Sequence, residues 1–451
     1  MTTEHSNSNA AVALGEHDPY AALRFANFCL YLIGNFLSTM GLQMQIVMVE
    51  LEVYERTDST MALGLIGLVQ VLPVILLTLV TGHVADRFDR KAIVILAMGA
   101  IALASIGLAW ISYVQGSILA VFACVLAIGV ARAFHQPAKA SLLVQIVPRP
   151  VFANAVTWST GTFQMAAAAG PVLGGMLVWR FGSYSLVYIL NAFMAISFCG
   201  LLLGVRRLIS TPPVQAATLK SLVAGVEFVW RKKILLAAMA LDMFAVLLGG
   251  AVALLPVYAS DEILGVGPAG LGWLRASQAI GALLMGFSLA HRRPMEHAGR
   301  ALLWSVAGFG VATIVFGFSR WYWLSLAMLF LTGALDNISV IVRHTLVQLL
   351  TPDEMRGRVS AVNSMFIGAS NELGAFESGA VAALLGGGAI GATLSVVSGG
   401  VGTIIVVIVL AALVPQLRNY GRLDGSDVEP SPDESPQPEV VAESSDTTGF
   451  H

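Results

Sequence analysis

Ionisable side chains inside long apolar stretches are the residues of this sequence most able to do chemistry. A charge at the centre of a bilayer costs at least about 2.5 kcal/mol, so such residues are kept where they bind ions or substrate or pair with one another. A buried carboxylate beside an arginine can exist both protonated and ionised, and can therefore carry a proton. The residues in question are Arg132, Asp242, Arg275, Asp336, Glu372 and Glu377.

The depths of these side chains indicate which of them can meet. At about 1.5 Å of helix rise per residue, Arg275 and Glu372 reach similar levels and can form a pair. Arg132, Asp336 and Asp242 share a second level, roughly 10 Å from one boundary of the bilayer, so one arginine faces two carboxylates. We expect Asp242 and Glu372 to be the proton-coupling groups. The alternative is that each belongs to a static ion pair that fixes helix packing.

Other reactive side chains lack the spacing of a catalytic or metal site. His135 has no second His, Cys or carboxylate at ligand spacing, so no metal or cofactor is expected. Glu377 and the acidic group within residues 50–55 are expected at a solvated extracellular rim. The chain contains neither a phosphate loop G-x-x-x-x-G-K-[ST] nor an H-E-x-x-H or G-x-S-x-G pattern. The sequence therefore predicts neither an enzyme nor a directly ATP-driven pump.

The elements that must position these residues are membrane-spanning helices. Hydrophobic residues make up 57% of the chain and charged residues 12%, against roughly 25% charged in soluble domains. A spanning helix needs about 20 mostly apolar residues, whereas membrane strands alternate over about ten. The sequence therefore predicts an all-α integral membrane protein with twelve transmembrane helices. The apolar runs lie near 25–49, 62–81, 92–112, 117–139, 153–178, 184–204, 234–257, 268–290, 300–319, 322–343, 359–386 and 389–414.

The basic residues predict the orientation. Of the 25 Lys and Arg residues, Arg56, Arg180 and Arg320 fall on one side, Arg132 and Arg275 lie inside runs, and all the others lie beside segments of the opposite side. Because basic residues are retained in the cytoplasm, both termini are predicted to be cytoplasmic, in a multi-pass protein of the cytoplasmic (inner) membrane.

Composition divides the chain into five parts. Residues 1–20 and the acidic, proline-containing residues 416–451 are expected to be disordered cytoplasmic termini. Residues 21–204 and 234–415 form an N-terminal and a C-terminal six-helix bundle. Residues 205–233 are expected to be a basic cytoplasmic linker that ends in an amphipathic helix along the membrane interface.

The two bundles are predicted to be repeats with the same topology, at an offset of about 204 residues. Six spans per half give both bundles the same direction through the membrane, so the repeat is parallel and a central cavity lies between the halves. The matched pairs are Gly82 with Gly286, Pro148 with Pro352, Gly170 with Gly374, and Gly175 with Gly379.

The loop between the second and third runs reads G-H-V-A-D-R-F-D-R-K and resembles the signature loop of the major facilitator superfamily. Its functional positions are Gly82, Asp86, Arg87, Arg90 and Lys91. The resemblance implies a two-bundle transporter fold, in which the Asp86 carboxylate contacts the region of residues 356–359 and latches the cytoplasmic side shut. The alternative is that the basic residues only set topology.

The fifth run contains GPVLGG, which resembles the antiporter motif of drug exporters in that superfamily. Its positions are Gly170, Pro171, Gly174 and Gly175, although Ala166 stands where the motif often has Gly. Close helix packing is an equal alternative. The stretches 241–259, 270–282 and 351–364 resemble the enterobactin-exporter-like branch of efflux permeases, so the resemblance covers roughly residues 20–415.

These observations predict a secondary active transporter that exports a small organic molecule by alternating access, with protons as coupling ion. The resemblance implies a drug-like compound or siderophore-like metabolite as substrate, a monomer in the bilayer, and no nucleic-acid partner. Uptake or exchange by the same fold remains open, because the signature loop is shared by importers and exporters. A non-transporting receptor or scaffold that uses the acidic tail is the alternative from another class.

Overall fold

The computed structural model describes residues 18–206, 219–292 and 295–421. Within these ranges the chain is helical and contains no strand. Most of the two predicted termini, and residues 207–218 of the basic linker, lie outside the described residues. The all-α prediction is therefore confirmed for the part of the chain that should span the membrane.

The first half is a bundle of six long helices joined by short turns. Ser59, Asp89 and Ser117 cap three of these helices, each accepting a hydrogen bond from a first-turn amide. Asp58 and Gly182 end two others in the left-handed conformation. The helices are α2 (Ala26–Thr57), α3 (Thr60–Arg87), α4 (Arg90–Tyr113), α5 (Ile118–Ile146), α6 (Phe152–Phe181) and α7 (Tyr184–Gly204), with the 3-10 turns η2 (Ala21–Arg24) and η3 (Arg149–Val151).

The second half repeats this arrangement after the connecting helix α8 (Leu219–Arg231). Its first span is interrupted at Gly249 and Gly250, where a side chain on Gly250 would overlap the Gly374 carbonyl and the Ser378 hydroxyl. The helices are α9 (Lys233–Leu248), η4 (Ala251–Leu254), α10 (Leu255–Ala259), α11 (Gly267–Ala290), α12 (Ala298–Phe318), α13 (Tyr322–Leu350), α14 (Asp353–Leu384), α15 (Gly388–Leu413) and α16 (Pro415–Arg418).

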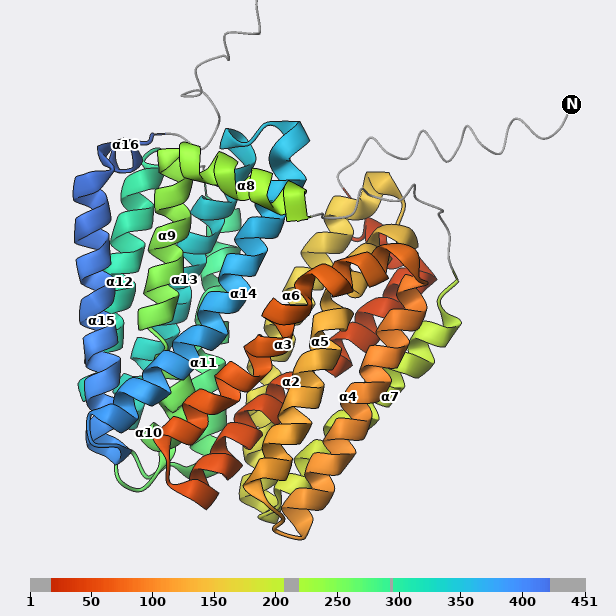
Figure 1. The fold of residues 1–451 in the computed structure, drawn as a ribbon, viewed down its shortest axis with the longest axis vertical. Helices are drawn as coiled ribbons and strands as arrows, with labels where there is room; N and C mark the ends of the chain where they lie inside the picture. The colour runs from red at the N-terminus through yellow and green to blue at the C-terminus, as the bar shows by residue number, and fades with distance from the viewer. Residues whose placement is uncertain (1–17, 207–218, 293–294, 422–451) are drawn as a thin grey trace, which may run out of the picture.

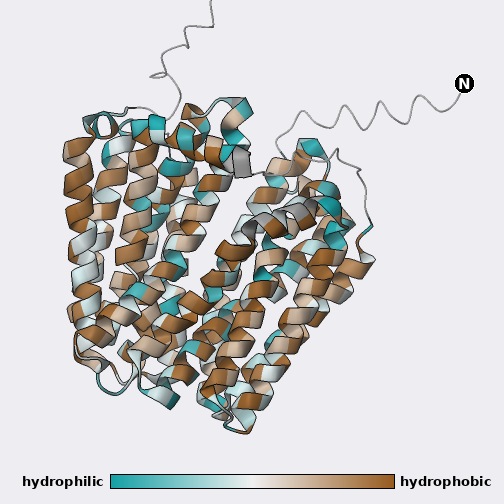
Figure 2. Ribbon diagram, in the orientation of Figure 1, coloured by the Kyte–Doolittle hydropathy of each residue, from teal (hydrophilic) through white to brown (hydrophobic). Residues whose placement is uncertain are grey.

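Ten of the predicted spans are long and apolar enough to cross a membrane by composition alone. The other two, α11 and α14, are equally long but carry polar and charged residues that face the interior between the halves. Together with the packing described below, they complete the twelve-helix architecture that the sequence predicts. Most of the length of the helices is hydrophobic (Figure 2). Large apolar side chains such as Leu96, Leu119 and Trp304 are exposed, as expected for a multi-pass membrane protein.

The two halves touch near one end of the molecule and diverge toward the other (Figure 1). We call the end that carries α8 and α16 the terminal face, and the opposite end the distal face. Toward the distal face, α3 packs on α14 and α6 packs on α11. A side chain added at Gly64 would meet the Phe376 carbonyl at 2.9 Å, so glycines allow the two backbones to approach closely.

The matched glycines of the repeat occupy equivalent contacts in the two halves. Gly170 of α6 packs on α2, and its partner Gly374 of α14 packs on α9. Gly175 of α6 packs on α11, and its partner Gly379 packs on α3. Since α2 and α9 begin the two halves and α3 and α11 follow them, the repeat seen in sequence corresponds to a repeat in packing.

Candidate substrate cavity

A cavity of about 420 Å³ lies between the two halves and is the candidate substrate site. Its walls come from helices of both bundles, and it contains charged side chains from each of them. The charged residues in its lining are Glu50, Arg132, Arg275, Asp336 and Glu372, and the amide residues are Gln43, Gln70, Gln136, Gln278 and Asn371.

Arg132 and Glu372 form an ion pair that crosses the cavity. The guanidinium of Arg132 in α5 lies 3.6 Å from the carboxylate of Glu372 in α14, and it donates a 2.7 Å hydrogen bond to the side-chain oxygen of Gln70. Both charged side chains are about one quarter exposed, at 22% and 27%. The pair is therefore reachable from the cavity and links the two halves.

The ion pairs predicted from depth along the helices were wrong, because the charged residues have other partners. Glu372 pairs with Arg132 rather than with Arg275. Arg275 instead lies within electrostatic reach of Glu50, a residue expected at the extracellular rim but found in the cavity wall. Each half thus contributes an arginine that faces a carboxylate of the other half.

Asp336 is a cavity carboxylate without a charged partner. It lies in α13, where Arg132 was expected to face it, yet the described residues provide it with no hydrogen bond or ion pair. It also lines a small recess that it shares with Asp242. Asp336 therefore connects the central cavity to a more deeply buried charge.

Asp242 belongs to a different pair, inside the second half. Its carboxylate forms an ion pair with Arg343 of α13, and the two side chains are only 6% and 2% exposed. The pairing with Arg132 expected from depth is absent. Arg343 was missed because it lies at the end of an apolar run, where a basic residue is ordinarily interfacial. Its apolar neighbours in VIVRHTL were the available signal.

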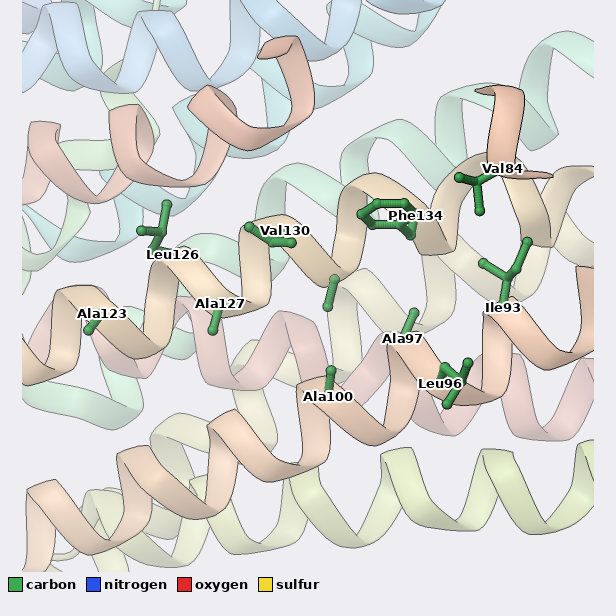
Figure 3. Close-up of a pocket in the computed structure, with 11 residues that line it drawn as sticks. Val84, Ile93, Leu96, Ala97, Ala100, Ala123, Leu126, Ala127, Val130 and Phe134 are labelled. Carbon is green, nitrogen blue, oxygen red and sulfur yellow. The ribbon is translucent and has the colours of Figure 1, made fainter. Parts of the chain in front are cut away.

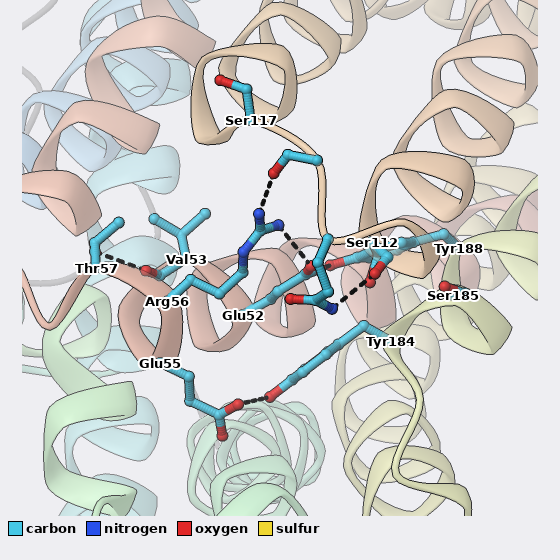
Figure 4. A network of polar contacts seen from close by, with 12 residues as sticks. Glu52, Val53, Glu55, Arg56, Thr57, Ser112, Ser117, Tyr184, Ser185 and Tyr188 are labelled. Carbon is cyan, nitrogen blue, oxygen red and sulfur yellow. Dashed lines mark hydrogen bonds and ion pairs between the residues drawn. The ribbon is translucent and has the colours of Figure 1, made fainter.

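Glu52, near the distal end of α2, belongs to a buried network rather than to a solvated rim (Figure 4), whereas Glu55 is exposed as expected. Glu52, which is 2% exposed, pairs with Arg56 at 3.2 Å and accepts a 2.6 Å hydrogen bond from the Tyr188 hydroxyl. Arg56 also donates to the carbonyl of Gly116, and Tyr184 donates to Glu55 at 2.6 Å. The network ties α2, α7 and the α4–α5 turn together within the first half.

Glu377, the other expected rim residue, is half-buried and accepts a hydrogen bond from Ser378.

The signature loop spans the end of α3 and the start of α4. Asp89 accepts a 2.9 Å hydrogen bond from the Lys91 amide and caps α4, whereas Asp86 lies in the last turn of α3 and its side chain is not among those described. The Lys91 ammonium donates to the Leu203 and Val205 carbonyls at 3.2 and 2.9 Å. Arg90 is buried and contacts the Ala85 carbonyl at 3.5 Å, while Arg87 is exposed.

Space around the signature loop shows that the halves are apart at the terminal face. Among the residues that the structure describes, a side chain added at Gly82 of α3 would meet nothing within 4 Å, and the same is true of Gly357 in the region expected to receive the loop. The glycine is therefore not needed for packing in this conformation. A requirement for it would arise only in a state where the terminal face closes.

The GPVLGG motif of α6 serves two different contacts. Side chains at Gly170 and Gly174 would overlap Met40 and Met44 of α2, within the same half. A side chain at Gly175 would overlap the Pro268 carbonyl of α11, and Gly272 of α11 faces the Pro171 carbonyl in the same way. The motif therefore packs its own bundle and also forms part of the distal contact between halves.

A larger groove of about 590 Å³ lies on the outside of the first half, between α4 and α5 (Figure 3). Its lining is entirely apolar and includes no ionisable side chain. The groove opens on the outer surface, where lipid tails would lie; its exposed lining residues include Leu96, Leu126 and Val130. The smaller central cavity remains the candidate site because it alone of the two carries polar groups that could orient a ligand. Among the described residues, no group of three His, Cys, Asp or Glu side chains could hold a metal ion.

The sequence matches the family described as transmembrane secretion effector over residues 17–449. Among curated relatives, the enterobactin exporter EntS of Shigella flexneri is 28% identical over 400 residues, which cover 86% of this chain and 92% of that protein. EntS of Citrobacter koseri is 28% identical over 398 residues, with the same coverage of 86% and 92%.

Solved structures of transporters share the fold. A bacterial homologue of the human lysosomal transporter Spinster has a TM-score of 0.66 over 90% of this chain and 98% of its own, at 16% identity. A POT family transporter in complex with a thioalcohol-conjugated peptide has a TM-score of 0.67 over 86% and 96%, at 12% identity. The chain therefore belongs to the transmembrane secretion effector family and is a membrane transporter of the major facilitator superfamily, not an enzyme.

Proposed function

We propose that this transporter exports a small polar organic molecule from the cytoplasm in exchange for protons. The observation that carries the proposal is the Arg132–Glu372 ion pair, which joins the two halves inside the polar cavity. A charge pair at the moving interface can respond both to a proton and to a bound solute. The exporter names of the relatives support the outward direction.

The terminal face is proposed to be cytoplasmic. Basic residues are retained in the cytoplasm, and their distribution favours this orientation. It places both termini in the cytoplasm of a bacterial cell and the protein in the inner membrane. With that orientation the distal contacts of Gly64, Gly175 and Gly379 seal the outer side, and the cavity is the inward-facing site. The protein is proposed to act as a monomer, since the cavity is complete within one chain.

The proton would act on Glu372. With the terminal face cytoplasmic, the state that is open at that face has the carboxylate paired with Arg132, as expected after its proton has been released to the cytoplasm. Substrate then binds in the cavity, and the halves rock to face outward. A proton taken up by Glu372 from outside neutralises the carboxylate and frees Arg132, so the substrate leaves and the protein returns.

Asp336 and Asp242 are proposed to have different roles. Asp336 lines the cavity and has no hydrogen bond or ion pair among the described residues, so it can bind a proton or a cationic group of the substrate. Asp242 is enclosed with Arg343, and it can couple to Asp336 only through the recess that the two acids share. Asp242 therefore acts as a second coupling group or as a packing anchor, and the two roles predict different behaviour of double variants.

The substrate class follows from the lining. Amide side chains, two arginines and three carboxylates surround the cavity, with Phe163 and Phe309 as the aromatic lining residues. Such a wall suits a polar or zwitterionic molecule with several hydrogen-bonding groups, and it suits a large hydrophobic cation poorly. A siderophore-like metabolite fits this chemistry, and the relatives named enterobactin exporter support a metabolite rather than a hydrophobic drug as substrate.

Flux in proteoliposomes with an imposed pH gradient tests the proposal, using a panel of siderophores and polar metabolites. Wild-type protein should move one class of solute only while the gradient persists, and Glu372→Gln should lose gradient-driven transport but retain exchange of solute for solute. Glu377→Gln on the same helix, outside the cavity lining, is the matched control. Gradient-driven flux that is equal in Glu372→Gln and wild type would refute the assigned role.

A further inference from the structure

A second groove, of about 440 Å³, lies at the terminal end of the second half between α8, α9, α14 and α15. Apart from Lys233 and the indole of Trp230, its lining consists of hydrocarbon and thioether side chains. Trp230, Phe244 and Phe366 are exposed, so the groove opens on the outer surface of the bundle. It is separate from the central cavity.

The length of the groove matches one leaflet of a bilayer. Its lining follows α9 from Lys233 to Phe244, which at 1.5 Å per residue is roughly 16 Å. The hydrocarbon core is about 30 Å thick, so one leaflet supplies chains of roughly this length. Phe366 of α14 and Leu410 of α15 line the other sides of the same groove, which we also call the slot.

Positive charge is concentrated at the terminal end of this slot. Lys233 lines it and Lys232 precedes it, and both are exposed. Arg231 is already paired with Glu227 at 2.5 Å. Within the described chain neither lysine has an ion-pair partner, so two positive charges stand at the mouth of an apolar slot.

We propose that this groove binds one anionic glycerophospholipid of the terminal-face leaflet. One acyl chain fills the slot along α9, and the phosphate lies between Lys232 and Lys233. An anionic headgroup offsets part of the charge of the two lysines, whereas a zwitterionic headgroup brings a cation of its own and offsets none of it. A soluble anion would leave the apolar wall exposed, and a second copy of the chain would have to bury both charges. The groove between α4 and α5 differs in this respect, because its lining includes no basic residue, and Lys91, two residues before its lining residue Ile93, already donates to two backbone carbonyls.

Native mass spectrometry of the full chain in a non-ionic detergent tests the proposal with defined lipids. Phosphatidylglycerol should bind in one tight copy, at least about tenfold more tightly than phosphatidylcholine with the same chains, since each basic side chain near an anionic headgroup is worth roughly fivefold in affinity. The Lys232→Gln/Lys233→Gln variant should lose that difference. Arg149→Gln/Arg300→Gln removes two exposed terminal-face charges outside the groove and is the matched control.

The apolar part of the site is tested independently of the charge. Ala240→Phe places a ring in the slot and should weaken phosphatidylglycerol binding about tenfold while the thermal unfolding midpoint stays within a few degrees of wild type. Glycerol 3-phosphate, which has the headgroup charge but no chain, should not compete. Equal binding of the two lipids, equal loss in the lysine variant and its control, or effective competition by glycerol 3-phosphate would each overturn the proposal.

Discussion

Arg132 of α5 lies 3.6 Å from Glu372 of α14, and this ion pair joins the two halves of the transporter across the central cavity. Because the pair belongs to two bodies that must separate and rejoin, its geometry should depend on the state of the protein. A pair inside one rigid bundle, such as Asp242 with Arg343, would not change in this way.

The charge-exchanged variant Arg132→Glu/Glu372→Arg should recover part of the transport that each single reversal abolishes, because the two opposite charges again face each other. Solute flux without a pH gradient is the measurement. Arg275→Glu combined with Glu372→Arg is the comparison, since these two residues are not paired. Recovery in the comparison variant to the same extent as in the Arg132 exchange would contradict the pairing.

Asp242→Asn should destabilise the protein by about 3–5 kcal/mol, because it leaves the buried guanidinium of Arg343 without its counter-charge. Asp242→Leu/Arg343→Met removes both charges and should restore most of the thermal unfolding midpoint measured in detergent. If this double variant also transports against a gradient, Asp242 is a packing anchor. If it folds but only equilibrates solute, Asp242 is a coupling group.

Gly82→Leu should leave the state that is open at the terminal face intact and prevent closure of that face. The added side chain meets none of the described residues here, but it would lie between the halves when they approach each other. Distances between spin labels on the terminal ends of α3 and α14 should stay long when substrate is added, and transport should fall at least tenfold. Gly99→Leu, which also meets nothing within 4 Å, is the control. Normal closure in the Gly82 variant would argue against a role for the loop in sealing that face.

Gly379→Leu should have the opposite effect and open the distal face, because its side chain would collide with the backbone of Gly64. Labelling of a cysteine placed at Leu63 in the cavity wall by a membrane-impermeant thiol reagent added on the distal side should increase several-fold. The same measurement on Gly368→Leu, a position of α14 with no neighbour within 4 Å, should show no increase. Equal labelling in the two variants would contradict a role of the distal glycines in sealing that face.

Glu52→Ala should lower stability by about 3–5 kcal/mol, since Arg56 and the Tyr188 hydroxyl would lose a shared buried acceptor. The thermal unfolding midpoint of the purified protein is the measurement. Glu55→Ala removes the partner of Tyr184, whose hydrogen bond is exposed, and should shift the midpoint by much less. Similar shifts in the two variants would mean that Glu52 is solvated after all.

The sequence alone determined the spans, their approximate ends, the repeat and the positions of the signature loop. These depend on local properties: apolar run length, the spacing of Gly and Pro residues, and the distribution of basic residues. They do not require knowledge of which helices are neighbours. The equivalent contacts of Gly170 and Gly374 show that a repeat read from spacing can extend to packing.

Only the tertiary structure decided which charges meet. Depth along a helix is set by residue number, but partners depend on the rotation of each helix about its axis and on which helices cross. Neither can be obtained from one sequence. Glu372 therefore pairs with Arg132 rather than with Arg275, and Asp242 pairs with the unexpected Arg343. Arg56 is a local partner of Glu52, four residues along the same helix, but Tyr188 comes from the distant helix α7, and this contact could not be read from spacing.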